Sequence, residues 1–519
     1  MSPPGLTLTV SRDPGSPGSS VFDLPTQSAN VPAGPRQTHP SLKHNDAWTS
    51  DAEAAPAYVV ISGGTGGNAI CAAFGTRTCY VLPVSDDGGS SAEIIRVLGG
   101  PSIGDIRSRL VRLIPPAPRD SPLHAIRALL AYRLPAHLDE RAARDEWRDI
   151  VEGRSALWRG IPHDRKETIR GFLVYFESEL LKRAHKNFTF VNGSVGNYLL
   201  AGAQGFFRSL PAAIFLFSSI TNSQANILPV IVTNHTVTIA AELDNGEKLV
   251  GQCEISHPVP AQSATGAVAG TVSDVPVDGM GEAFAQRRNV LFEQQSKDAY
   301  QTLSARISLW LIHSSRAGMY YMNAYGFEIH PSPNPEYLAA LATNDMLVYS
   351  CGSLWTRWED LNLLGATDAY ARSIIPCLAL HGVAAAIARS RSLRAKVLLL
   401  NAKNDRETDG YTAVDYINAI TRTLNAHYST PSYGLAYGSS TIFPVSSVSL
   451  HFTCGNSLTW SCRAFITDLV YLKDASVVVD QRQISAMGVR CTEVDGHGSG
   501  VFDAAGVKQA LDEIMLLDQ

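Results

Sequence analysis

Two adjacent carboxylates, Asp86 and Asp87, are the side chains of this sequence best suited to chemistry. They follow the apolar run of residues 78–84, which is typical of a buried strand, and they precede two glycines. Neighbouring carboxylates can hold Mg²⁺, orient a nucleophilic hydroxyl or bind a ribose. We therefore predict that Asp86 and Asp87 bind Mg²⁺ or act in catalysis. The alternative is a tight turn, which does not require two acids before the glycines.

The serines behind these acids indicate the start of a helix. Ser90 and Glu93 have the spacing of a capping box, in which each side chain bonds a backbone N–H of the first helical turn. Hydroxyl and amide groups at a helix start can also hold a phosphate. We expect Ser90 and Ser91 to contact a phosphorylated ligand.

A glycine-rich loop lies earlier in the chain, between a strand-like run at residues 57–61 and a predicted helix at residues 68–74. Glycines let the backbone approach a phosphate closely, and a helix start offers free N–H groups. The pattern is a variant of the dinucleotide-binding fingerprint, with Asp86 about twenty residues further on. A plain tight turn is the alternative. The residues predicted to bind phosphate here are Gly63, Gly64, Thr65, Gly66 and Gly67.

The motif Gly-Asp-Ile-Arg adds a base and a further acid at Arg107 and Asp105. Arg107 can donate two parallel hydrogen bonds to phosphate oxygens. Asp105 can act in catalysis, reach a metal or pair with Arg107, and a structural Asp–Arg pair is the alternative for both. We expect the nearby Arg109 and Arg112 to lie on the helix surface.

Two further loops place polar residues at the ends of predicted elements. Asn192, Ser194 and Asn197 open an apolar helix, where they can cap the helix or bind a base or a phosphate. Gly352 and Ser353 follow another strand-like run. In an open α/β sheet, ligands bind at the carboxyl ends of the strands. We therefore include these five residues among the predicted ligand-binding residues.

The alternation of strand-like runs and helices predicts an α/β fold with a Rossmann-like, mostly parallel sheet and helices on both faces. Residues 1–55 are rich in Pro, Ser, Gly and Asp, and we expect them to form a disordered tail. Residues 56–519 are expected to form a single domain. Within it we expect a helical insertion near residues 139–187 and a loop or helical insertion near residues 257–300.

Composition excludes several classes of function. The 519 residues have a formal net charge of −5 and a pI near 6.3, whereas a general nucleic-acid binder usually has a basic face and a pI above about 9. No apolar stretch reaches the ~18–20 residues of a membrane span, and the amino terminus lacks a signal-peptide pattern. The eight cysteines contain no CxxC pair. We expect a cytoplasmic protein without nucleic-acid or membrane partners, and a homodimer stays open.

The order of these motifs resembles the CofD-like family. That family includes the archaeal 2-phospho-L-lactate transferase and the bacterial gluconeogenesis-factor regulators of UPF0052 type. The resemblance rests mainly on the Asp-Asp-Gly-Gly-Ser-Ser string with Gly-Asp-Ile-Arg downstream, and it covers residues 57–515. Further matching motifs are Gly63-Gly-Thr-Gly66, Ser194-Val-Gly-Asn197, Ala241-Glu-Leu-Asp-Asn-Gly246, Gly352-Ser-Leu-Trp-Thr356 and Glu407-Thr-Asp-Gly-Tyr411.

The resemblance implies a nucleoside-diphosphate ligand at the strand ends. In the transferase branch, a phospholactyl or phosphoenolpyruvyl group moves from a guanosine-diphosphate donor to a deazaflavin alcohol, with Mg²⁺. The regulator branch resembles binders of uridine-diphospho sugars, and this sequence is closer to it because the transferases differ over residues 86–91. The tail and the insertions suggest a eukaryotic member, and together with the altered residues around Asp105 and Gly352 they leave the identity of the acceptor open.

We therefore expect a CofD-like transferase that uses a nucleoside-diphosphate donor. The alternative is a non-catalytic protein that binds a nucleotide sugar and regulates metabolism or morphogenesis. A nicotinamide-dependent dehydrogenase would also explain the spacing of Gly64, Gly66 and Asp86. It would leave the Asp-Asp-Gly-Gly-Ser-Ser loop without a role.

Overall fold

The computed structural model describes residues 55–63, 66–85, 89–224, 226–242, 248–250, 319–352, 354, 374–404, 408–426, 459–496 and 500–517. The chain divides into two units, Met1–Ala54 and Ala55–Gln519, and all described residues belong to the second. The predicted tail, apart from Ala55, lies outside the described residues. So does the insertion predicted near residues 257–300.

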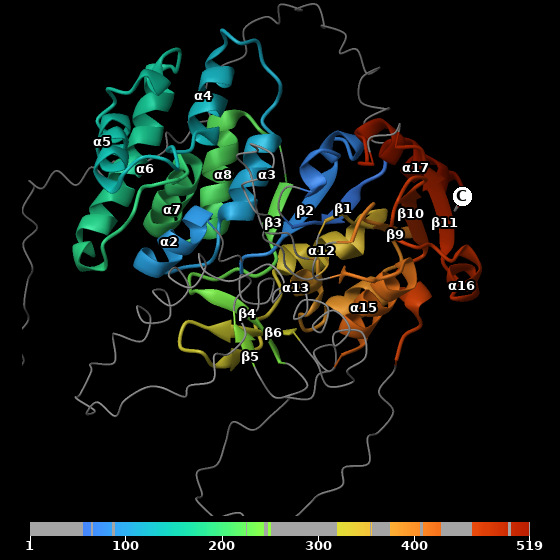
Figure 1. Cartoon of the computed structure of the whole chain (residues 1–519). Coiled ribbons are helices and arrows are strands. Elements are labelled where there is room, and N and C mark those ends of the chain that lie inside the picture. The colour runs from blue at the N-terminus through green and yellow to red at the C-terminus, as the bar shows by residue number, and fades with distance from the viewer. Residues whose placement is uncertain are drawn as a thin grey trace, which may run out of the picture. The chain divides into compact units, whose positions relative to one another are not determined.

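A seven-stranded parallel sheet organises the second unit, in the order β11-β10-β9-β8-β1-β2-β3 (Figure 1). The strands are β1 (Tyr58–Ile61), β2 (Thr78–Leu82), β3 (Asn226–Pro229), β8 (Met346–Tyr349), β9 (Ala395–Leu399), β10 (Asp468–Leu472) and β11 (Arg490–Val494). Counted along the chain within this sheet, the order is 3-2-1-4-5-6-7, which contains the Rossmann order. The strand order therefore reverses between β1 and β8, and this is the switch point of the sheet.

Helices accompany the strands along the chain. Figure 1 shows α2 to α8 together on the β3 side of the sheet, and α15 to α17 beside β9 to β11. The helices are α2 (Gly89–Leu98), α3 (Gly104–Arg112), α4 (Pro122–Ala131), α5 (Glu140–Val151), α6 (His163–Leu181), α7 (Val195–Phe207), α8 (Leu210–Thr221), α12 (Pro335–Thr343), α13 (Ile375–Leu378), α14 (Val383–Arg389), α15 (Ala413–Asn425), α16 (Gln481–Ala486) and α17 (Ala504–Leu517).

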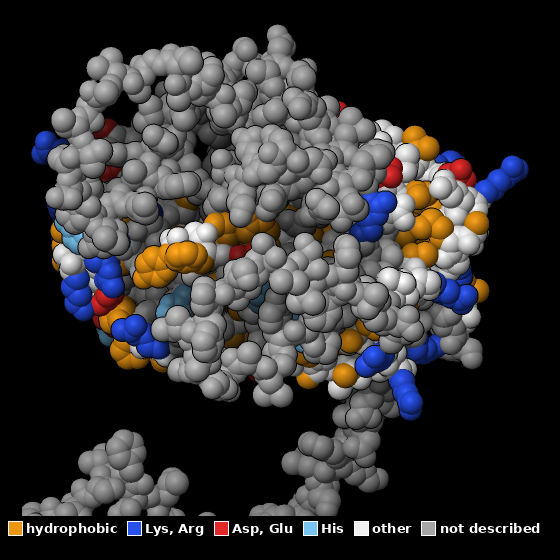
Figure 2. Space-filling view, turned by 90° about the horizontal axis from the view of Figure 1, so that it is seen from below, with side chains coloured by type: hydrophobic (Ala, Val, Ile, Leu, Met, Phe, Trp, Pro, Cys, Tyr) orange, Lys and Arg blue, Asp and Glu red, His pale blue; other side chains and the backbone are white. Residues whose placement is uncertain are grey.

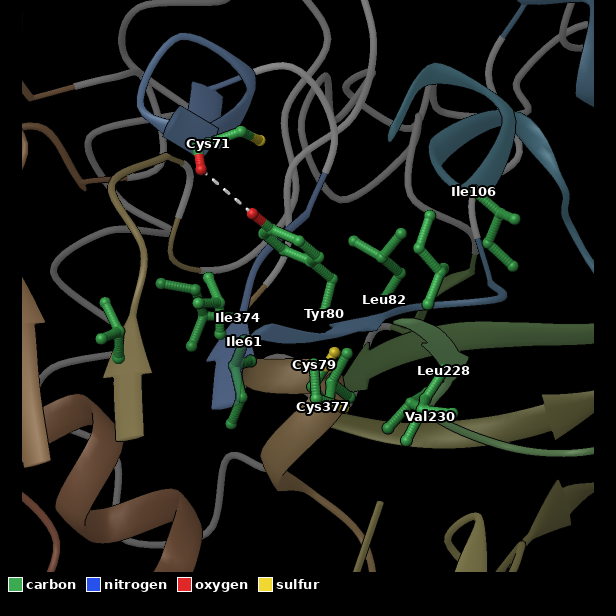
Figure 3. Packing of buried hydrophobic residues seen from close by; sticks show 14 of the residues in the cluster. Ile61, Cys71, Cys79, Tyr80, Leu82, Ile106, Leu228, Val230, Ile374 and Cys377 are labelled. Atoms are coloured by element: carbon green, nitrogen blue, oxygen red, sulfur yellow. Dashed lines mark hydrogen bonds between the residues drawn. The ribbon is translucent and has the colours of Figure 1, made fainter. Parts of the chain in front are cut away.

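The central strands are buried on both faces. Strands β1, β2, β8 and β9 consist entirely of buried residues. Because successive side chains of a strand point to opposite faces, such strands need a cover on each side. Figure 3 shows Tyr80 and Leu82 of β2 on the side of Ile106 in α3, and Cys79 on the side of Cys377 in α13. The predicted α/β class, with a parallel sheet between helices, is confirmed.

A second, smaller sheet is antiparallel and has the order β5-β4-β6-β7. Its strands are β4 (Val237–Glu242), β5 (Lys248–Val250), β6 (Met319–Asn323) and β7 (Glu328–Ile329). In the pairing of β4 with β5, Glu242 lies opposite Lys248 and Ala240 lies opposite Val250. This sheet lies below the parallel sheet in the view of Figure 1.

The segment expected to be a helical insertion contains α5 and α6 and packs against α7. The contact is aromatic, and Tyr198 of α7 lies at its centre. The Tyr198 ring is 4.9 Å from that of Trp147 and stacks on that of Phe176 at 4.7 Å. Phe188 and Phe190 complete the cluster around the same ring. The segment therefore supports the first turn of α7.

Figure 2 shows Lys and Arg side chains of the described residues at several places along the edge of one face. Three large aromatic side chains on α7 and α8, Phe206, Phe207 and Phe215, are exposed. No helix within the described ranges is long and apolar enough to cross a membrane.

Candidate functional site

Hydroxyl side chains follow three neighbouring central strands at their carboxyl ends. Ser62 comes directly after β1, Ser350 comes directly after β8, and Ser85 comes a few residues after β2. All three are buried. Because the strands are parallel, their carboxyl ends meet at one edge of the sheet, where open α/β sheets bind ligands. The edge at the switch point is thus lined by hydrogen-bonding groups.

Four residues meet at this switch point, and we call Ser62, Gly67, Arg109 and Ser350 the switch-point cluster. Arg109 Nη2 donates to Ser62 Oγ at 2.7 Å, and Nη1 donates to the Gly67 carbonyl at 3.5 Å. A Cβ atom at Gly67 would lie 2.7 Å from both Ser62 Oγ and Ser350 Oγ. A larger residue at this position would therefore displace Ser62, Ser350 or Arg109, in addition to any effect on phosphate binding.

The segment after the glycine loop is not the predicted helix. In place of a helix over residues 68–74, the chain forms two short 3₁₀ turns, η2 (Gly66–Asn68) and η3 (Cys71–Ala73). The prediction of a helix here was wrong. The argument that a helix dipole helps to hold phosphate at this loop consequently does not apply.

Side chains from β2 explain why the α-helix does not form. Tyr80 donates its hydroxyl to the Cys71 carbonyl at 3.3 Å (Figure 3). Thr78 Oγ1 donates to the Phe74 carbonyl at 2.7 Å. Gly75 ends the segment with a φ of +69°. These contacts occupy carbonyls at the end of a very short segment, whereas α-helices gain stability only over several turns.

Arg109 is not on the helix surface, so this expectation was also wrong. Its side chain is 0% exposed, and its guanidinium contacts the Cys71 sulfur at 2.9 Å and lies 4.8 Å from the centre of the Tyr80 ring. Arg112, three residues on, is exposed as expected. Residues 104–110 of α3 are all buried, because the helix packs on α4, α7, α8 and β3, and only its last residues reach solvent. The local sequence carries no signal for this, because a charged helix residue is ordinarily exposed.

A second group of polar residues is drawn from three helices, and we call Ser90, Arg107 and Asn197 the helix-start cluster. Asn197 Nδ2 donates to Ser90 Oγ at 2.8 Å, and Arg107 Nε donates to Asn197 Oδ1 at 3.0 Å. All three side chains are buried. Each was predicted separately as a ligand-binding residue, and the structure brings them together.

The first turn of α7 and the turn before it orient Asn197. Ser194 is the N-cap residue, and its Oγ accepts the Asn197 N–H at 3.5 Å. Asn192 adopts a φ of +56°, and its carbonyl accepts from Arg133 Nη1 at 2.7 Å. Ser194 therefore has the capping role that was left open as an alternative, and the backbone of Asn192 shapes the turn.

The capping box expected from Ser90 and Glu93 is not formed. Helix α2 begins at Gly89, so Ser90 and the buried Ser91 already lie inside it. The Glu93 carboxylate accepts from Arg96 at 2.7 and 2.8 Å and from the Thr189 N–H at 2.8 Å. Glu93 thereby links α2 to the chain before α7, and Ser90 is left to accept from Asn197.

Helix α3 separates the two clusters. Arg107 and Arg109 are two residues apart, which places them about 200° apart around an α-helix and hence on opposite sides. Arg107 contacts α7, and Arg109 contacts the switch point. Asp105, buried in the first turn, faces another neighbour: burial raises the pKa of the Cys377 thiol, and the charge of Asp105 raises it further. The catalytic role of Asp105 stays a prediction.

Several predicted residues cannot be placed. Gly63, the first residue of the glycine loop, is buried, and its carbonyl accepts from Ser62 Oγ at 3.1 Å. Among the described residues, no group of three or more His, Cys, Asp or Glu side chains could hold a metal ion. The predicted Mg²⁺ ligands, Asp86 and Asp87, lie outside the described residues. The predicted site residues that lie outside the described ranges are Gly64, Thr65, Asp86, Asp87 and Ser353.

Asn401 is a residue that the sequence argument missed. Its Oδ1 accepts the Gly352 N–H at 2.7 Å, and its Nδ2 donates to the Gly352 carbonyl at 2.5 Å. Gly352 has a φ of +147°, which favours glycine. Asn401 lies two residues after β9, and Ser350 lies directly after the neighbouring strand β8. The signal that could have identified it is a polar side chain behind a buried strand.

Asn401→Ala is expected to lower the free energy of unfolding by about 1–2 kcal/mol, because two hydrogen bonds to one peptide are lost. Urea denaturation monitored by circular dichroism measures this change. Asn401→Asp is the matched control: it keeps the acceptor for the Gly352 N–H and loses the donor. Unfolding of Asn401→Ala at the wild-type urea midpoint would show that the contact does not hold the loop.

Comparison with known proteins gives consistent matches along most of the chain. The model of the family described as 2-phospho-L-lactate transferase CofD matches residues 58–495. An uncharacterized protein of Saccharomyces cerevisiae is 32% identical over 486 residues, which cover 88% of this chain and 99% of that protein. A crystal structure of a UPF0052-family protein of Bacillus halodurans is similar with a TM-score of 0.48 and 16% identity, covering 89% of this chain and 99% of that one. A second structure of the Bacillus halodurans protein has a TM-score of 0.47 and 18% identity, covering 88% and 99%.

Proposed function

Because this chain belongs to the CofD family, we propose that it binds a nucleoside diphosphate or a nucleotide sugar at the carboxyl ends of its parallel strands. We further propose that it transfers a phosphorus-containing group from that donor, as the family description implies. Ser90, Arg107 and Asn197 of the helix-start cluster would contact the phosphate groups of that donor.

The observation that carries this proposal is the helix-start cluster. Its guanidinium, hydroxyl and carboxamide come from three helices and are linked by hydrogen bonds of 2.8 and 3.0 Å. Asn197 fixes the Nε side of Arg107 and thereby the plane of the guanidinium. A planar guanidinium held in this way is suited to bind two phosphate oxygens at once. In the sequence, Asp86 and Asp87 precede Ser90 by four and three residues.

The proposed reaction is a displacement at phosphorus. The hydroxyl oxygen of the acceptor forms a bond to the phosphorus atom of the donor, and the bond from phosphorus to the nucleoside monophosphate breaks. The hydroxyl proton passes to a carboxylate, for which Asp86, Asp87 and Asp105 are the candidates. Arg107 stabilises the charge on the departing phosphate. A Mg²⁺ ion held by Asp86 and Asp87 would neutralise part of the diphosphate charge.

Calorimetric titration with GDP and with UDP-sugars, with and without Mg²⁺, tests the binding proposal. We expect saturable binding of at least one of them, stronger with Mg²⁺ in the wild type. The variant Asp86→Asn/Asp87→Asn is expected to lose the Mg²⁺-dependent part, because it keeps the side-chain size and removes both charges. No binding of either ligand class would overturn the proposal. An unchanged Mg²⁺ effect in the variant would remove the metal assignment.

Turnover is tested separately. Chromatographic detection of nucleoside monophosphate released from a bound donor, in the presence of a hydroxyl acceptor, would support the transferase. Saturable binding without release from any donor would instead favour a regulator that only binds nucleotide sugars.

A further inference from the structure

Arg109 joins four separate parts of the fold around Gly67. Its two terminal nitrogens donate to Ser62 Oγ behind β1, to the Gly67 carbonyl and to the Cys71 sulfur, at 2.7, 3.5 and 2.9 Å. Its guanidinium lies over the Tyr80 ring of β2, 4.8 Å from the ring centre. The side chain itself is anchored on α3 and is fully buried.

The loop needs a support of this kind because no α-helix follows it. In a dinucleotide-binding fold, the helix after the glycine loop fixes the backbone that receives the phosphate. Here the chain continues into the 3₁₀ turns η2 and η3. A glycine-rich segment loses much conformational entropy when it is ordered, so other contacts must hold it in place.

The contacts require an arginine. The guanidinium of Arg109 is a rigid plane with two terminal nitrogens. Nη2 donates to Ser62 Oγ, and Nη1 donates to the Gly67 carbonyl and the Cys71 sulfur. A lysine ammonium is a single centre on a flexible stem, and it is more strongly hydrated, so its burial is more costly. Lysine would keep the charge of Arg109 without reproducing its bridge.

We propose that Arg109 is a positioning residue that holds the backbone at Gly67 in the shape that receives a nucleotide phosphate, without touching the nucleotide. This inference rests on the proposed function. In a dinucleotide-binding fold, the helix after the glycine loop holds this backbone in place. In this protein, a side chain of α3 would do so instead. Removal of Arg109 should therefore both loosen the loop in the free protein and weaken nucleotide binding.

The test compares Arg109→Met, Arg109→Lys and Ser62→Ala with Arg112→Met. Arg112 is the matched control because it lies on the same helix and donates to the Asn68 carbonyl at 2.6 Å, yet it is exposed. Hydrogen exchange of the peptide covering residues 62–73, measured without ligand, reports the order of the loop. Calorimetry with the nucleotide that the wild type binds, GDP or a UDP-sugar, reports the affinity.

We expect faster exchange in this peptide and a Kd raised about tenfold or more in Arg109→Met and Arg109→Lys, as for the loss of one or two buried hydrogen bonds. Ser62→Ala retains the arginine and removes one contact, so a rise of about fivefold is expected. It serves as the informative variant if Arg109→Met does not fold. Arg112→Met removes one exposed contact with Asn68 in the same peptide, so we expect a smaller rise in exchange than in Arg109→Met and an unchanged Kd.

Wild-type nucleotide binding with an unchanged Kd in Arg109→Lys and Ser62→Ala would overturn this inference while leaving the proposed function intact. A raised Kd with unchanged exchange at residues 62–73 would also overturn it, because Arg109 would then act without ordering the loop. If the wild type binds no nucleotide, the proposed function fails, and this inference fails with it.

Discussion

Gly196→Ala is expected to lower the free energy of unfolding by about 1–3 kcal/mol, the usual cost of forcing extra volume into a packed core. A Cβ atom at this position would lie 2.4 Å from the Leu130 carbonyl oxygen of α4 and 3.0 Å from Cγ and Cδ of Arg107. The first contact is with backbone, so it cannot be relieved by rotating a side chain. Helix α7 would have to move away from α3 and α4. Urea denaturation measures the change.

The same substitution should disturb the helix-start cluster. Asn197 is the next residue along α7, and its bonds to Ser90 and Arg107 are 2.8 and 3.0 Å long. A displacement of α7 by a few tenths of an ångström would stretch both. Nucleotide affinity should therefore fall in Gly196→Ala even at temperatures at which the variant is folded, and calorimetry at 10 °C measures this.

Gly171→Ala is the matched control. Gly171 is also a helical glycine, in α6, but a Cβ atom there would meet nothing within 4 Å. Its replacement should stabilise the protein by about 0.4–1 kcal/mol, because alanine has fewer unfolded conformations than glycine. Equal unfolding midpoints for Gly171→Ala and Gly196→Ala would contradict the close approach of α7 to α3 and α4.

Arg107→Met is expected to weaken nucleotide binding by about 10- to 150-fold, the equivalent of a charge-assisted hydrogen bond of about 1.5–3 kcal/mol. The variant keeps an extended side chain of similar volume and removes the guanidinium. It also leaves the buried Asn197 Oδ1 without the donor that it now accepts from. A smaller loss of stability should therefore accompany the loss of affinity. Calorimetry and thermal unfolding of the same samples separate the two effects.

Arg107→Lys distinguishes charge from geometry. It retains the positive charge but not the planar set of donors that binds two oxygens, so we expect an affinity between those of the wild type and Arg107→Met. Arg112→Met is the control for an arginine of the same helix, because Arg112 is exposed and donates to the Asn68 carbonyl rather than to the helix-start cluster. Wild-type affinity in Arg107→Met would exclude Arg107 from the site.

The elements that could be predicted from sequence are those whose signal is local. Residues 57–61, 78–84 and 346–350 are continuous apolar runs, and each contains a strand of the parallel sheet. Strands β10 and β11 were not predicted. Strand β10 begins with Asp468 and strand β11 begins with Arg490, and the buried Asp468 carboxylate accepts from Arg490 Nε at 2.7 Å. A charged residue therefore stands at the start of both strands, where an apolar run would have indicated a strand. Strand β11 is also only partly buried.

The candidate site was predictable residue by residue but not as an arrangement. Ser90, Arg107 and Asn197 were identified because each lies in a motif of small and polar residues. Arg107 is separated from Asn197 by 90 positions in the chain, and Ser90 is separated from Asn197 by 107 positions. No local spacing in the sequence predicts these contacts. The helical segment around Trp147 was predicted from the sequence to be an insertion. In the structure it packs on Tyr198, the residue next to Asn197.

The sequence by itself determined the class of fold, the family resemblance and the identity of the polar motifs, because burial on both faces and turn chemistry leave local patterns. Only the tertiary structure decided which charges are buried and what they hold. Arg109 is the clearest case: its own segment is typical of an exposed helix face, yet the packing of α3 against the sheet places it under the glycine loop. The reason is physical. The environment of a helix residue depends on what covers the helix, and that is set by segments distant in the chain.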